Sequence, residues 1–176
     1  NGKVDDFVGW NFINENGEQD NDPEPNLSSI DHGTHCIGIA DARTNNALQI
    51  ASVPWNVKFV ATKHSNSAGT TYDSDVYEGL IYVAELGADI ITNSWTSGIY
   101  SIAHHEIIEY AQSLGCIIVA AAGNDNNEIP NYPASYPGVV SVAATTVIDL
   151  KADFSNYGVA IDICAPGANI LSLAPY

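Results

Sequence analysis

The feature that most limits the possible folds is an alternation of helical patterns with short apolar runs. Residues 73–86 and 103–114 carry apolar side chains at helical spacing, and Gly87 and Gly115 follow them as stop signals. Short apolar runs, typical of buried strands, accompany these helices at 89–93, 116–122 and 139–144. The alternation predicts an α/β fold, a three-layer sandwich in which helices flank both faces of a mostly parallel sheet, with residues 116–122 buried on both faces.

Weaker signals extend this pattern toward both ends. Asp31 is a good N-cap, so a helix is expected from near His32 to residue 42. Further short runs are expected to contribute to the sheet or close the chain at 8–13, 57–62, 161–165 and 170–173. Active sites of parallel sheets gather at the carboxyl ends of strands, which points to the loops 94–98 and 123–127.

Composition sets the class of protein. With 176 residues and 45% hydrophobic content, residues 1–176 suit one globular domain, in which an acidic loop region (1–31) precedes the core portion (32–176). The 5 basic and 21 acidic residues give a net charge of −16, which repels phosphate backbones and anionic membranes. Neither nucleic acid nor a membrane is therefore an expected partner.

His32 and His35 open the expected helix. A histidine in the first turn lies at the positive end of the helix, which favours the neutral ring that a general base needs. Gly33 leaves room for a backbone or a substrate to approach. Two histidines three residues apart are alternatively metal ligands, although zinc helices usually space them four apart around a glutamate, which is absent here.

Two segments that follow strands carry small and polar residues. Asn124 comes just after the run 116–122, where its amide could reach a developing oxyanion, and Gly123 keeps the approach open. An ordinary Gly-Asn turn is the alternative. Trp95 follows the run 89–93, and its segment either pairs with an extended peptide or packs in the core.

An ordered set of motifs resembles the subtilisin-like (subtilase) family of serine proteases. These motifs are the histidine motif (32–38), the substrate-strand motif (92–95), the oxyanion motif (120–124), two further landmarks (132–137 and 154–158) and the segment before the serine region (165–167). They occur in the family's order and at its usual spacings. The resemblance implies the subtilisin-like fold and a serine endopeptidase.

The resemblance also assigns roles to residues. His32 would be the general base that takes the serine proton and returns it to the leaving amine, and Asn124 would donate to the oxyanion. Asn131 stands where the family often has glycine, so its side chain would shrink or polarise the specificity pocket. Thr96 and Ser97 also replace glycines and would narrow the groove. Substrate would be bound by the walls and floor of the cleft: Ser94, Trp95, Ala122, Gly123 and Asn131.

Two family motifs are absent from the sequence. The aspartate motif, Asp-Thr/Ser-Gly after a strand, would precede Asn1, and the serine motif would lie about ten residues past Tyr176. We therefore expect an internal fragment of a catalytic domain, incomplete at both ends and inactive alone. A catalytically inactive subtilase-like binding domain is the alternative. A Rossmann-type cofactor binder is disfavoured because no Gly-x-Gly-x-x-Gly follows the first strand.

No cofactor is expected for catalysis, but structural calcium is. By resemblance, Asn46 would offer its side chain, and Leu48 and Ile50 their carbonyls, in the family's calcium loop. Asp5 and Asp6 resemble the tail of a second calcium loop, for which a solvated acidic loop is the alternative.

The remaining expectations concern cysteines and cellular context. The odd count of three cysteines cannot form a closed disulfide framework. Cys36 stands where some subtilases carry cysteine, so it either neighbours the catalytic histidine or simply packs. By the resemblance the protein is secreted or extracellular and acts on polypeptides, with a pro-segment or a protein inhibitor as a further partner.

Overall fold

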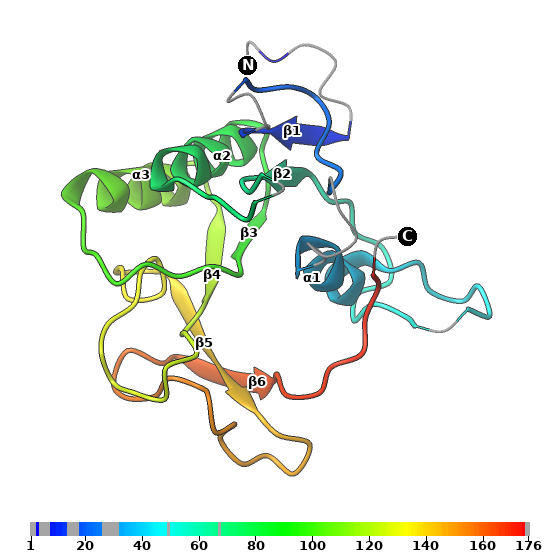
Figure 1. Ribbon diagram of the computed structural model, residues 1–176, viewed down its shortest axis with the longest axis vertical. Helices are drawn as coiled ribbons and strands as arrows, with labels where there is room; N and C mark the ends of the chain where they lie inside the picture. Colours follow the sequence, from blue (N-terminus) through cyan, green and yellow to red (C-terminus); the bar gives the residue numbers. More distant parts are fainter. Residues whose placement is uncertain are drawn as a thin grey trace. The chain divides into compact units, whose positions relative to one another are not determined.

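The structure is a computed structural model that describes residue 3 and residues 8–13, 18–25, 32–48, 50–66 and 68–174 (Figure 1). The chain divides into two compact units, one formed by residues 1–79 with 171–176 and the other by residues 80–170. The expected single domain over residues 1–176 stays a prediction.

The first unit contains two short parallel strands and the histidine helix. Strand β1 (Gly9–Asn11) pairs with β2 (Ala61–Lys63), and helix α1 spans His32–Asp41. The expected helix start near His32 is confirmed, whereas its expected N-cap Asp31 lies outside the described residues.

Helix α2 (Asp73–Glu85) contains the boundary between the units and ends where the sequence predicts. Gly87 adopts a φ of 84°, a left-handed conformation that glycine accepts without strain. Its N–H donates to the Ala84 carbonyl at 3.0 Å, and the Ala88 N–H donates to Val83 at 3.1 Å. These bonds satisfy carbonyls that the last turn of the helix would otherwise leave without partners.

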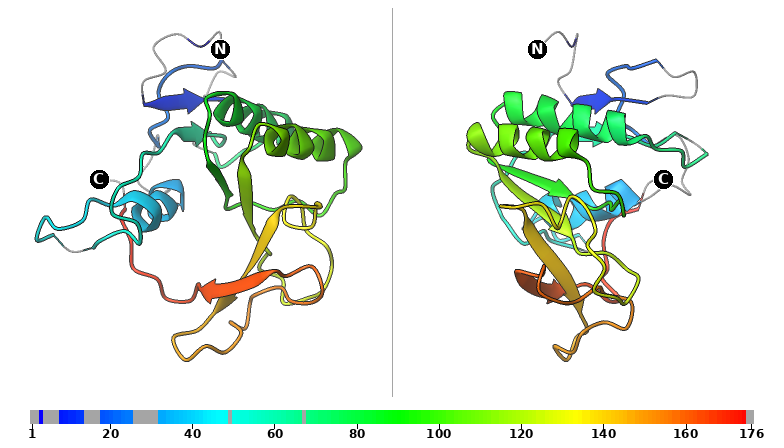
Figure 2. Two further views of the ribbon diagram at one scale, coloured as in Figure 1. Left: turned by 180° about the vertical axis from the view of Figure 1, so that it is seen from behind. Right: turned by 90° about the vertical axis from the view of Figure 1, so that its left-hand side faces the viewer.

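The second unit is built on a parallel four-stranded sheet (Figure 2). Its strands lie side by side in chain order: β3 (Ile90–Asn93), β4 (Ile117–Ala121), β5 (Val140–Thr145) and β6 (Ile163–Pro166). Helix α3 (Ile102–Ser113) connects β3 to β4 and contacts β4. The parallel α/β sheet predicted from the alternating pattern is therefore confirmed.

The expectation that residues 116–122 are buried on both faces is wrong for this structure. In β4 the side chain of Ile118 is fully buried, whereas Ile117 is 55% exposed, and the neighbouring Ile90 of β3 is 60% exposed. The cause is geometric: successive side chains of a strand point to opposite faces, and within this unit α3 contacts the sheet through β4. A continuous apolar run therefore did not establish that both faces are covered.

Two other apolar runs differ from their expected structure. Only the end of the run 57–62 is in a strand, because pairing with β1 begins at Ala61. Upstream of it, Val57, Phe59 and Val60 are exposed. Residues 170–173 form neither helix nor strand. None of the helices within the described ranges is long and apolar enough to span a membrane.

A partly buried histidine in the first unit predicts acid sensitivity. The His64 ring stacks on Phe12 with centroids 5.3 Å apart. Burial lowers the pKa of His64 from 6.5 to about 4 and outweighs the opposing effects of a hydrogen bond to the Asp75 backbone and the charge of Glu78. Between pH 6.5 and about pH 4, His64 therefore binds a proton more readily in the unfolded chain than in the folded protein.

We expect the free energy of unfolding to fall as the pH drops below 6.5 and the loss from His64 to be complete near pH 4. The pKa difference corresponds to a loss of roughly 3 kcal/mol. Denaturant unfolding of the full-length protein across this range would measure it, with His64→Gln as the comparison. An equally steep pH dependence in His64→Gln would contradict the prediction.

Candidate active site

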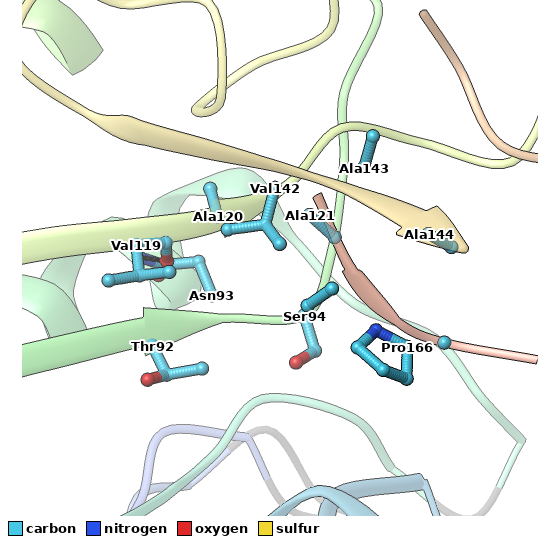
Figure 3. A pocket seen from close by; sticks show the side chains of 12 residues that line it. Thr92, Asn93, Ser94, Val119, Ala120, Ala121, Val142, Ala143, Ala144 and Pro166 are labelled. Carbon is cyan, nitrogen blue, oxygen red and sulfur yellow. Dashed lines mark hydrogen bonds between the residues drawn. The ribbon is translucent and has the colours of Figure 1, made fainter. Parts of the chain in front are cut away.

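The carboxyl ends of the strands in the second unit frame a hollow of about 270 Å³ (Figure 3). Asn93 at the end of β3 is in register with Ala120 of β4, so the loops that follow these strands leave the same edge of the sheet. Small side chains such as Ala121 and Ala144 line the hollow, together with Pro166 of β6. Among the predicted site residues, Ser94 also lines it.

The loop after β3 is fixed by a backbone pair to a distant segment. Ser97 and Tyr132 form an antiparallel bridge in which the Ser97 N–H donates at 2.7 Å and the Tyr132 N–H donates at 2.8 Å. Trp95, two residues before Ser97, is half-buried. The pairing joins the segment that follows the predicted wall residues Ser94 and Trp95 to the residue directly after Asn131, the predicted floor of the pocket.

Asn124 lies in the loop that follows β4 and is exposed. No side-chain hydrogen bond of Asn124 occurs within the described part of the chain, so its amide is available to a ligand. The preceding Gly123 has a φ of 111°, which orients this turn and which other residues rarely adopt. A donor at the carboxyl edge of a parallel sheet is chemically suited to an oxyanion.

Two buried asparagines pack behind this turn. A side chain at Gly123 would collide with the amide nitrogens of Asn131 and Asn156. Asn131, the predicted pocket floor, is thus in contact with the predicted wall. Asn156 was not singled out from the sequence beyond its place in a family landmark. No sequence signal predicts its role, because its contacts are with residues about 30 positions earlier.

His32 is the first residue of α1 and is exposed. The sulfur of Cys36, one helical turn later, lies 3.8 Å from His32 Nε2, so Cys36 neighbours the predicted catalytic histidine. His32 belongs to the first unit, whereas the predicted residues Ser94 to Asn131 belong to the second.

The predicted calcium loop forms a tight turn. The side-chain oxygen of Asn46 accepts from the Leu48 N–H at 3.0 Å, and the flanking Asn45 and Ala47 have φ values of 53° and 59°. Calcium takes about six to eight oxygen ligands, usually with carboxylates. Asn46, Leu48 and Ile50 supply three neutral oxygens, which fit part of such a site only. The described ranges contain no cluster of three acidic, histidine or cysteine side chains suited to a metal, and Asp5 and Asp6 lie outside them.

The fold and the site together define a parallel α/β protein with an amide donor exposed at the carboxyl edge of its sheet. The chain belongs to the subtilase family, whose family model matches residues 2–175. This confirms the family resemblance seen in the motifs. The fold is likewise confirmed as subtilisin-like by solved structures.

Several known proteases are similar to the chain. It is 38% identical over 167 residues to thermitase of Thermoactinomyces vulgaris, covering 95% of this chain and 57% of that protein. It is 35% identical to the halolysin-like extracellular serine protease Nep of Natrialba magadii, covering 97% and 30%. A solved protease from Pseudoalteromonas arctica PAMC 21717 superposes with a TM-score of 0.80 at 31% identity, covering 90% and 56%. The chain thus spans little more than half the length of thermitase.

Proposed function

We propose that the protein containing this chain is a secreted serine endopeptidase of the subtilisin type. The observation that carries the proposal is the exposed Asn124 amide in a subtilase oxyanion loop at the carboxyl edge of the sheet. The aspartate and the serine of the triad would come from parts of the protein outside these 176 residues. Its relatives include one serine protease described as extracellular, which supports secretion.

In this mechanism each residue has one task. His32 takes the proton from the serine hydroxyl as it attacks the peptide carbonyl, and later gives that proton to the leaving amine. Asn124 donates a hydrogen bond to the carbonyl oxygen as it becomes negative. Ser94 and Trp95 bind the substrate backbone on one side, with Ala122 and Gly123 on the other. Polypeptides are the substrates, and a pro-segment or a protein inhibitor would occupy the same cleft.

A fluorophosphonate probe tests the function on the full-length mature protein. Mass spectrometry should find the label on a serine shortly beyond the position of Tyr176. Folded mature protein that takes no label would favour the alternative of an inactive subtilase-like binding domain. That alternative is motivated by the absence of both the aspartate and the serine motifs from these residues.

Asn131 is proposed to limit the specificity pocket. Its side chain is buried and contacts the position of Gly123, where it adds bulk and polarity to the pocket floor. Cleavage of a peptide library should therefore disfavour large aromatic P1 residues, and Asn131→Gly should increase their kcat/KM by about 10-fold, as for a pocket enlarged by a few atoms. A P1 profile already dominated by large aromatic residues would contradict this assignment.

Structural calcium at the loop containing Asn46, Leu48 and Ile50 remains a proposal supported by the turned backbone of that loop. Further ligands would have to come from outside this trio, and Asp5 and Asp6 are proposed for a second site. Since an ion that binds only the folded state stabilises it, excess chelator should lower the melting temperature by several degrees. A melting temperature that chelator leaves unchanged would argue against both sites.

A further inference from the structure

The loop that carries Asn124 is held by a second segment of the chain, residues 154–157, which we call the clasp. Backbone bonds join them at three points. The Asn126 N–H donates to Phe154 at 2.9 Å, the Asn156 N–H donates to Gly123 at 3.0 Å, and the Tyr157 N–H donates to Asn127 at 3.1 Å. The loop is therefore paired along its length rather than free to sample other conformations.

The Asn156 side chain adds bonds on both sides of Asn124. Its Nδ2 donates to the Ala122 carbonyl at 3.0 Å, and its Oδ1 accepts from the Asp125 N–H at 2.8 Å and from the Asn127 N–H at 3.4 Å. Asn156 is only 2% exposed, so water cannot reach these groups. If the three bonds were lost, the polar groups that make them would be left buried without partners, which costs free energy. One amide thus fixes the backbone before and after the oxyanion donor.

The clasp is itself anchored to the sheet. Ser155 is 1% exposed, and its hydroxyl accepts from the Ala144 N–H of β5 at 2.9 Å while donating to the Asn156 carbonyl at 3.0 Å. Lys151 donates to the Asn126 side chain at 2.7 Å and to the Ser155 carbonyl at 3.1 Å. A rigid path therefore runs from β5 through Asn156 to the loop.

From these contacts we propose that Asn156 is a positioning residue that holds Asn124 aimed at the oxyanion. This inference rests on the proposed function. An oxyanion donor contributes to the rate only if it is already oriented when negative charge develops, because reorientation during the reaction costs energy. Displacement of such a group by about 1 Å can cost 10²-fold in rate. Asn156 acts through Asn124 and need not touch the substrate.

The test is a double-mutant cycle in the full-length protein. Asn156→Ser removes the three side-chain bonds and should lower kcat by about 10- to 100-fold while KM changes little. In an Asn124→Ala background the same change should lower kcat by less than about 3-fold, because no donor remains to be positioned. Equal losses of kcat in both backgrounds would overturn the proposal.

Two further variants separate positioning from loss of stability. Ser155→Ala removes two buried bonds, one from the Ala144 N–H and one to the Asn156 carbonyl, but none that reaches the loop. At a similar loss of melting temperature it should therefore retain more activity than Asn156→Ser. If Asn156→Ser does not fold, Lys151→Met serves instead: it should lower kcat by about 3- to 10-fold, again only when Asn124 is present. Unchanged kcat in Lys151→Met with Asn124 present would also overturn the proposal.

The wild-type protein distinguishes this proposal from the proposed function. If the wild-type protein is active and the Asn156 and Lys151 variants have the same kcat as wild type, the positioning role of Asn156 is refuted but the endopeptidase function is not. Wild type that takes no fluorophosphonate label and hydrolyses no peptide would refute the endopeptidase and, with it, a positioning role in catalysis. Amide exchange at Asp125 and Asn127 would then still report whether Asn156 orders the loop.

Discussion

Replacement of His32 by alanine is expected to reduce kcat of the full-length protein by about 10⁶-fold, which is the size of the loss measured when the triad histidine of subtilisin is removed. The serine hydroxyl is a weak nucleophile unless a neighbouring base removes its proton during attack. His32 is exposed at the first position of α1, so its loss should leave the fold intact. Single-turnover kinetics with a chromogenic peptide ester, together with a melting curve, would measure both effects.

His104→Ala is the matched control, because His104 also lies in the first turn of a helix, α3, and has no assigned role in the reaction. His104 is half-buried and has no assigned task in the reaction, so the variant should retain kcat within about 3-fold. A His32→Ala enzyme with near wild-type kcat would show that another group acts as the base. It would then leave the histidine motif without its proposed function.

Replacement of Asn124 by alanine is expected to lower kcat by about 10²- to 10³-fold with little change in KM, which is the loss measured for the corresponding donor in subtilisin. The loss falls on kcat because the hydrogen bond is stronger in the transition state than in the bound substrate. Since the amide is exposed and holds no bond within the described part of the chain, folding should not depend on it.

Asn124→Asp sharpens this prediction. It keeps the size of the side chain but replaces the donor by a carboxylate, whose charge would repel the oxyanion, so kcat should fall further than in Asn124→Ala. Asn56→Ala, at another exposed asparagine, is the control and should behave as wild type. If Asn124→Asp were as active as wild type, the loop after β4 would not be the oxyanion site.

The sequence by itself determined the parts of this protein that depend on local or periodic patterns. Helical spacing and Gly87 located α2 and its end, and the alternation of helices with apolar runs determined a parallel sheet. Because parallel strands share one carboxyl edge, the order of the apolar runs was enough to single out the segments beginning at Ser94 and Gly123. The ordered motifs identified the family.

Only the tertiary structure decided which residues support the candidate site. The packing of Asn131 and Asn156 against Gly123, and the pairing of Ser97 with Tyr132, join segments far apart in sequence. Likewise, the apolar pattern of β4 did not reveal that Ile117 is exposed, because exposure depends on what packs on each face of the sheet. The spacing of apolar residues along the sequence reports on one helix or strand at a time. The contacts of Asn131, Asn156 and Ser97 instead depend on how loops from different strands meet at the edge of the sheet.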